Sequence, residues 1–121
     1  MNNKFTLVIG ASENPDRYSF KAINMLRNHQ QPVKAFGIKK GKVADVVFDT
    51  TFPTSGEFDT ITLYINPKIQ AEYQEAILAL KPKRVIFNPG TESDSFQKVL
   101  EQNGIEALEA CTLVLLQTGQ Y

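Results

Sequence analysis

Residues 5–19 read FTLVIGASENPDRYS, and the rest of the chain can be interpreted outward from them. The first five residues form a short, nearly continuous apolar run, which is typical of a strand buried on both faces. Gly10 ends that run, and a polar loop leads to a helix whose Ala22, Ile23 and Leu26 make one apolar stripe. We expect Ser19 to be the N-cap of this helix. A strand, a loop containing glycine and a helix, in this order, predict the start of an α/β unit.

The alternation of strand and helix patterns continues along the chain. Further strands are predicted at 33–38, 60–65, 84–87 and 105–108, with a shorter candidate at 46–48. Asn66-Pro67 predicts the start of a helix that runs to residue 80, and Phe96, Val99 and Leu100 mark another that ends at Asn103-Gly104. The apolar tail, residues 111–118, is predicted to be helical. The pattern indicates one α/β domain over residues 1–121, with a doubly wound, mainly parallel sheet of about five strands covered by helices on both faces.

Composition excludes several classes of function. Thirteen basic and thirteen acidic residues leave no net charge, so a nucleic-acid partner or a membrane surface is not expected. One cysteine and one histidine are too few for an internal disulfide or a Cys/His metal site. The start of the chain lacks the apolar region of a signal peptide, and we expect a cytoplasmic protein with Cys111 as a small, buried, reduced thiol.

Polar and small residues follow each predicted strand. Four such segments, 10–19, 38–42, 65–67 and 88–92, are rich in Gly, Ser, Asn, Pro, Lys and Thr. In a doubly wound sheet the carboxyl ends of the strands meet at one edge, and ligands bind where the strand order reverses. The sequence therefore predicts a ligand site at this edge.

The loop before the first helix has groups that suit a phosphate. A helix N-terminus offers unpaired N–H groups and about half a positive charge, while Ser12 and Ser19 add hydroxyls and Arg17 a guanidinium. The spacing matches neither G-x-G-x-x-G nor a Walker loop. An ordinary strand-to-helix loop with a solvated arginine explains the segment equally well.

Lysines follow the second strand, at the place where an NAD-binding domain has an acidic residue for the ribose. Lys39 and Lys40 suit a phosphorylated ribose instead, such as that of coenzyme A (CoA) or NADP. A solvated lysine turn is the alternative interpretation.

Val8-Ile9-Gly10-Ala11-Ser12, followed by Asn14-Pro15, Arg17 and Ser19, resembles the small single-domain CoA-binding protein family. That family is related to the N-terminal CoA-binding domain of the succinyl-CoA synthetase alpha subunit. The resemblance covers nearly the whole chain, up to Ala110-Cys111, although relatives often have Asn-Pro where this chain has Gly37-Ile38. It implies a Rossmann-like fold and CoA or acyl-CoA as ligand. The further domains of the synthetase are not expected here, so the implied role is binding without the ligase reaction.

The resemblance also implies which part of CoA each candidate residue meets. The assignments are the pyrophosphate for Gly10, Ala11, Ser12 and Ser19 with Arg17 as counter-charge, the 3′-phosphate for Lys39 and Lys40, the adenine for Ile65, Asn66 and Pro67, and the pantetheine arm for Asn88, Pro89, Gly90 and Thr91.

Two other functions stay open at this point. An NADP-binding oxidoreductase domain would use the same phosphate groups, but no tyrosine has a recognisable catalytic spacing. A protein-interaction domain without a small-molecule ligand would use the apolar residues 113–116 to contact a partner or a second copy in a homodimer.

Overall fold

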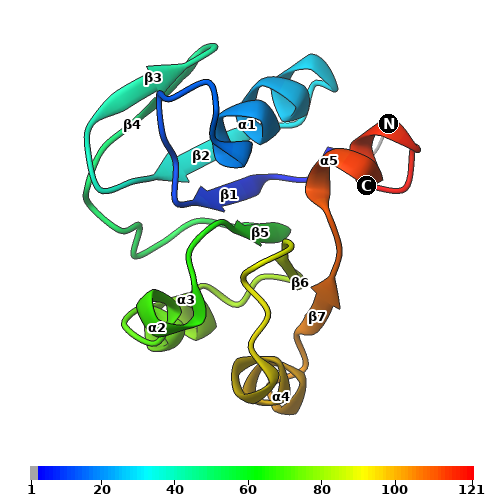
Figure 1. Cartoon of the computed structure of the whole chain (residues 1–121). Coiled ribbons are helices and arrows are strands. Elements are labelled where there is room, and N and C mark those ends of the chain that lie inside the picture. The colour runs from blue at the N-terminus through cyan, green and yellow to red at the C-terminus, as the bar shows by residue number, and fades with distance from the viewer. Residues whose placement is uncertain (1–2) are drawn as a thin grey trace.

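The computed structural model describes residues 3–121 and has a central parallel sheet with strand order β2-β1-β5-β6-β7 (Figure 1). A two-stranded antiparallel hairpin, β3–β4, lies beyond β2. The elements, in chain order, are β1 Thr6–Ile9, α1 Tyr18–Asn28, β2 Val33–Phe36, β3 Gly41–Val43, β4 Val46–Phe48, β5 Thr60–Leu63, α2 Pro67–Gln70, α3 Gln74–Leu80, β6 Arg84–Phe87, α4 Asp94–Gln102, β7 Glu106–Glu109 and α5 Thr112–Gln117.

Both faces of the sheet are covered by helices. Alternate residues of β1 point to opposite faces and contribute to two separate cores. Leu7 and Ile9 belong to a core with residues of α3 and α4, whereas Val8 belongs to a second core with residues of α1 and α5. All three side chains are fully buried. Figure 1 shows α1 and α5 above the sheet and α2, α3 and α4 below it. The predicted doubly wound α/β fold, with a parallel sheet of five strands, is confirmed.

The strand order reverses at β1. This strand pairs in parallel with β2 on one side and with β5 on the other, and the chain leaves β1 toward α1 but leaves β5 toward α2. The loops after β1 and β5 therefore diverge to opposite faces, which places the expected ligand crevice at the carboxyl ends of these strands.

The β3–β4 hairpin extends the sheet at the β2 edge. One parallel bridge joins Phe36 to Asp49, and Gly37 N donates to the Asp49 carbonyl at 3.2 Å. At the tip of the hairpin, Arg27 of α1 donates to both carboxylate oxygens of Asp45, at 2.8 and 2.9 Å. These bonds hold the pKa of Asp45 below its ordinary value. Only the second strand of this hairpin was predicted from the sequence.

The prediction that Ser19 is the N-cap of α1 is wrong. The helix begins at Tyr18 with Arg17 as its N-cap, and Ser19 is buried within the first turn. The reason lies in the loop, which closes a turn at Asn14: Asn14 Oδ1 accepts from Asp16 N at 3.0 Å, and the Asn14 carbonyl accepts from Arg17 N at 3.0 Å. The chain therefore leaves that turn already in position to start the helix.

The helix predicted from residue 66 to residue 80 is two helices. Asn66 caps α2 as expected, with its Oδ1 accepting from Ile69 N at 3.0 Å, and Pro67 is the first helical residue. The chain then turns at residues 71–73 before α3 starts. Tertiary contacts explain the break, because Gln70 is drawn inward to two loop carbonyls while the Tyr73 ring stacks on Phe52.

Strand ends differ from the prediction by one or two residues. β2 ends at Phe36 and β5 at Leu63, each two residues early, because the following residues turn away from the sheet to form the edge loops. The last strand is shifted by one residue, and the predicted terminal helix is confirmed as α5. No helix within residues 3–121 is long and apolar enough to cross a membrane.

Gly10 allows the chain to leave β1 at the reversal point. Its φ is +100°, and a methyl group built on it would lie 2.9 Å from the Tyr64 carbonyl oxygen of the neighbouring loop. Both the positive φ and the close backbone approach therefore require glycine.

We expect Gly10→Ala to lower the free energy of unfolding by about 2–4 kcal/mol, because backbone strain and a clash with rigid backbone add up. Gly104→Ala is the matched control, since Gly104 also has a positive φ, +75°, but no atom within 4 Å of the added methyl group. It should cost about 1 kcal/mol. Urea denaturation of the two variants measures the difference, and equal losses would show that the contact with Tyr64 is unimportant.

Candidate site at the carboxyl edge of the sheet

The loops after β1 and β2 touch through their backbones. Gly10 N and Ala11 N both donate to the Phe36 carbonyl, each at 2.9 Å. A methyl group on Gly37 would lie 2.5 Å from the Ala11 carbonyl oxygen. Only glycine fits there, which accounts for Gly37 at this position. The hydrogen bonds to Phe36 also engage the N–H groups of Gly10 and Ala11, so a contact of these two residues with a phosphate would use other atoms.

Free donors lie further along the first loop. The N-terminus of α1 has no side-chain cap and no acidic residue in its first turn, so the N–H groups of Tyr18, Ser19 and Phe20 have no partner within residues 3–121. Ser12 Oγ accepts from Asn14 N at 3.1 Å, which leaves its hydroxyl proton able to donate. The side chain of Ser19 is buried, and its N–H group is one of the donors without a partner in the described part of the chain.

The cations that the sequence analysis assigned to phosphate groups face solvent at this edge. Arg17, Lys39 and Lys40 are exposed and form no ion pair with another described residue. Arg17 stands at the uncapped end of α1, and the two lysines stand in the turn that Gly37 holds against Ala11. The β1–α1 and β2–β3 loops therefore place unpaired positive charge on both sides of their backbone contact.

The loops after β5 and β6 are joined by a residue that the sequence analysis missed. Gln70 is fully buried, and its Nε2 donates to the Ile65 carbonyl at 2.8 Å and to the Thr91 carbonyl at 2.6 Å. Ile65 is half-buried, while Asn66 and Pro67 are exposed at the start of α2. A glutamine on a predicted amphipathic helix resembles a surface residue, so no sequence signal marked it.

Asn88 supports the edge from inside. Its Nδ2 donates to Thr62 Oγ1 at 2.6 Å and to the Leu63 carbonyl at 2.8 Å, and its Oδ1 accepts from Thr112 N at 2.9 Å. The buried side chain thus connects β5, β6 and the start of α5. Thr91 is also buried, and its hydroxyl donates to the Asn88 carbonyl at 2.8 Å.

Pro89 and Gly90, by contrast, are exposed at the rim of the same loop. Gly90 has a φ of +93°, and its N–H donates to Glu92 Oε1 at 2.9 Å. Within the segment expected to guide a pantetheine arm, the structure therefore exposes the two central residues and buries the side chains of the two outer ones.

Tyr64 is a second residue that the sequence analysis did not assign to the site. Its hydroxyl is buried without a hydrogen bond, whereas the nearby hydroxyls of Thr62 and Thr112 bond to each other at 2.8 Å. Burial raises the pKa of Tyr64 to about 12, although the nearby threonine hydroxyls oppose the shift. Cys111 also lies close enough to act on this pKa; its side chain is free and half-buried, rather than fully buried as expected.

Two surface hollows lie away from the carboxyl edge. One, of about 410 Å³, lies beside the hairpin and is lined by residues 34–35, 47–49 and 51–55. The other, of about 530 Å³, lies next to the amino ends of β1 and β5 and is lined by residues 3, 5, 56–59, 80–81 and 83. Residues 3–121 contain no group of three or more acidic, histidine or cysteine side chains that could hold a metal ion.

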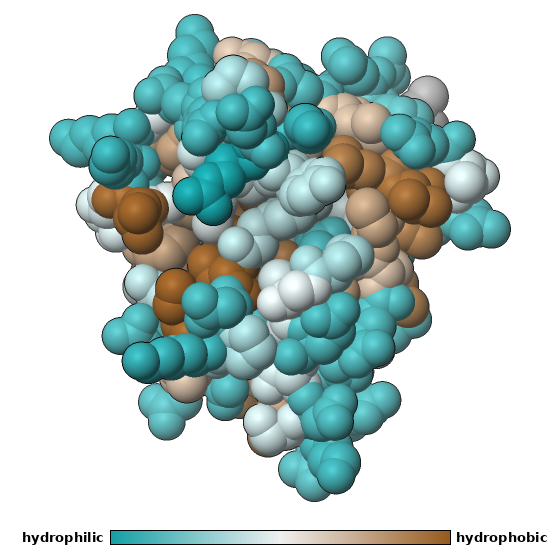
Figure 2. All heavy atoms as spheres, in the orientation of Figure 1, coloured by the Kyte–Doolittle hydropathy of each residue, from teal (hydrophilic) through white to brown (hydrophobic). Residues whose placement is uncertain are grey.

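Figure 2 shows the surface of the molecule in the orientation of Figure 1. Mainly hydrophilic side chains lie over the upper left of this view, and apolar ones lie at the right, over α5.

A parallel, doubly wound sheet with unpaired cations and an uncapped helix at its carboxyl edge defines a small Rossmann-like α/β domain. The chain belongs to the family described as the CoA binding domain, whose family model matches residues 4–117. The comparison with curated proteins gave no match.

Solved structures have the same fold. The crystal structure of an uncharacterized protein is 43% identical, with all of both chains covered and a TM-score of 0.95. A Thermus thermophilus structure, cell-free ID.343, is 19% identical, with 98% of this chain and 91% of that chain covered and a TM-score of 0.86. A conserved hypothetical protein from Pyrococcus furiosus is 24% identical, with 93% and 98% covered and a TM-score of 0.77. The last two likenesses show the fold alone.

We expect Tyr64→Phe to leave the free energy of unfolding at pH 7 unchanged or to raise it by up to about 1 kcal/mol, because a buried hydroxyl without a partner is removed. At high pH the free energies of unfolding of the wild type and of Tyr64→Phe should differ. A tyrosine whose folded pKa is raised contributes stability below its unfolded pKa, near 10, and loses that contribution as pH rises to about 12. The wild type should therefore lose about 1–3 kcal/mol more than Tyr64→Phe between pH 10 and pH 12. Parallel curves of stability against pH would contradict this.

Proposed function

We propose that this protein binds CoA or an acyl-CoA at the carboxyl edge of its sheet and performs no chemical step of its own. The observation that carries the proposal is the pairing of an uncapped α1 N-terminus and Arg17 with the Lys39-Lys40 turn, held together by the contact of Gly37 with Ala11. CoA has two separate phosphate groups, a diphosphate and a 3′-phosphate on the ribose. Two separate cationic segments fit such a ligand, and membership of the CoA binding domain family supports it.

The diphosphate lies, on this proposal, at the start of α1. The N–H groups of the first helical turn and the Ser12 hydroxyl are donors without acceptors, and the helix dipole favours an anion there. Arg17 supplies a guanidinium, which can bond two phosphate oxygens at once. Gly10 and Ala11 contribute a bare backbone surface that lets the diphosphate approach, since their own N–H groups are used.

The 3′-phosphate meets Lys39, with Lys40 beside it, in the turn after β2. Neither lysine has an ion-pair partner within residues 3–121, so binding a phosphate would not require an existing salt bridge to break. Because both side chains are exposed, their interaction with phosphate depends on salt concentration.

The uncharged parts of CoA contact the other two loops. Ile65, Asn66 and Pro67 border the adenine, and the exposed Pro89 and Gly90 border the pantetheine arm. Asn88 and Thr91, whose side chains are engaged inside the protein, hold that loop in place. No acyl group is favoured over another by these residues.

We expect CoA, at 100 times its Kd, to stabilise the native state by about 2.7 kcal/mol, because it binds only the folded protein. A thermal-shift screen with CoA, acetyl-CoA and NADPH measures this as a rise in Tm. NADPH should give no rise, since its extra phosphate is on the ribose 2′-oxygen and it lacks a pantetheine arm. A rise with NADPH alone would favour the oxidoreductase alternative, and no rise with any nucleotide would favour an interaction domain.

We expect Lys39→Ala to weaken CoA binding about tenfold, the loss of one charge-assisted contact, while binding of dephospho-CoA stays unchanged. Arg17→Ala should weaken the binding of both ligands by a similar factor, because both contain the diphosphate. Lys98→Ala, an exposed lysine on α4, is the control for a change in net charge. Isothermal titration measures the three variants, and an equal effect of Lys39→Ala on both ligands would remove the lysine from the 3′-phosphate site.

A further inference from the structure

An acidic side chain crosses between the two cationic loops. Glu13 Oε2 accepts a hydrogen bond from Lys42 N at 2.9 Å, which links the β1–α1 loop to the first residues of β3. The Glu13 side chain also lies over Gly41, where an added methyl group would be 2.6 Å from Glu13 Cγ. The carboxylate and the backbone of β3 are therefore in direct contact.

The Glu13 carboxylate is unfavourably placed for a site that binds an anion. A negative charge in the loop of Arg17, bonded to the chain three residues after Lys39, weakens the attraction of both cations for phosphate, because a carboxylate repels an anion. Glu13 is exposed, so burial does not hold its side chain there. Its hydrogen bond to β3 is the interaction that offsets the unfavourable charge.

The contact fixes the near end of the β3–β4 hairpin. The far end is held to α1 by the bonds between Arg27 and Asp45. The turn with Lys39 and Lys40 lies between Gly37, which is pressed against Ala11, and the bond from Glu13 to Lys42. Without that bond, the turn is tied to the first loop at one end only.

We propose that Glu13 is a positioning residue that sets where the Lys39-Lys40 turn lies relative to Arg17, and so determines the preference of the site for CoA over dephospho-CoA. This rests on the proposed function. Glu13 itself does not touch the ligand; it acts through the backbone of the turn.

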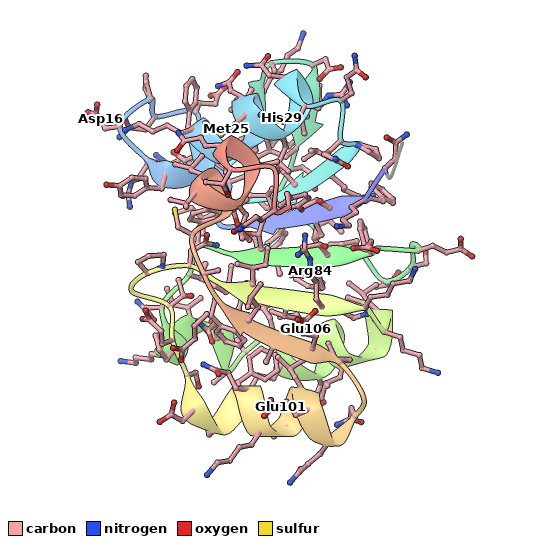
Figure 3. All side chains as sticks on the ribbon, turned by 90° about the vertical axis from the view of Figure 1, so that its right-hand side faces the viewer. Asp16, Met25, His29, Arg84, Glu101 and Glu106 are labelled. Atoms are coloured by element: carbon pink, nitrogen blue, oxygen red, sulfur yellow. The ribbon has the colours of Figure 1, made fainter. Side chains whose placement is uncertain are left out.

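The experiment compares the ratio of the two ligand affinities in matched variants. Glu13→Ala removes the acceptor and the charge, whereas Glu13→Gln removes the charge but keeps an oxygen acceptor for Lys42 N. Asp16→Ala removes one negative charge from the same loop. The Asp16 carboxylate forms no hydrogen bond or ion pair with another described residue, and Figure 3 shows it at the outer tip of the loop, pointing away from the sheet.

We expect Glu13→Ala to reduce the ratio of dephospho-CoA Kd to CoA Kd by about three- to tenfold, which is the range for one lost hydrogen bond. Asp16→Ala should keep the ratio of the wild type. Glu13→Gln should keep the ratio or raise it, because it retains an acceptor for Lys42 N and removes a charge that repels the 3′-phosphate. Isothermal titration with both ligands measures the ratio. Hydrogen exchange of the Lys42 amide in the ligand-free protein measures the contact itself, and it should become faster in Glu13→Ala alone.

Three experimental results would overturn the positioning role of Glu13. An equal change of the ratio in Glu13→Ala and Asp16→Ala would show that only charge matters and would overturn the positioning role. A wild-type ratio in Glu13→Ala, with the Lys42 amide exchanging faster, would overturn it too, because the contact would exist without affecting the ligand. Wild-type protein that binds neither ligand would overturn the proposed function, and this role with it.

Discussion

The candidate site depends on a close approach between two backbones. The Phe36 carbonyl accepts from the N–H groups of both Gly10 and Ala11, and Gly37 then passes so near the Ala11 carbonyl that no side chain fits. This contact joins the exits of β1 and β2 into one surface. The uncapped end of α1 and the lysine turn are neighbours for that reason, although about 20 residues separate them in the sequence.

The other half of the edge is organised by buried polar side chains. Asn88 uses its donor and its acceptor on three elements, and Gln70 connects the loops after β5 and β6 through two carbonyls. Buried amides are costly unless they are bonded. Asn88 bonds through both its nitrogen and its oxygen, whereas Gln70 bonds through Nε2 alone and its Oε1 is buried without a partner among the described residues. The groups available to a ligand are the exposed residues of the loops that Asn88 and Gln70 hold in place. The opposite edge is closed in a similar way, where Arg84 donates to Thr60 and to the Tyr121 carbonyl (Figure 3).

The sequence drew attention to exposed residues of the candidate site but not to the buried residues that support it. Arg17, Lys39 and Lys40 were selected because cations at the carboxyl ends of strands suit phosphate groups, and the structure has all three exposed at that edge. Gln70 and Tyr64 were missed because a glutamine on an amphipathic helix and a tyrosine after a strand are ordinary there. The bonds from Gly10 N and Ala11 N to the Phe36 carbonyl could not be predicted either, since a sequence does not show which carbonyl a backbone donor meets.

The sequence by itself determined the alternation of strands and helices, the parallel sheet covered on both faces and the set of loops that meet at the carboxyl edge. Hydrophobic periodicity and helix-ending residues are local signals, and they suffice for that. Only the tertiary structure decided the split of the helix after Asn66, the pairing of β3 with β4 and the bond from Glu13 to β3. Each of these is a contact between distant residues, whose energy depends on how close the fold brings them.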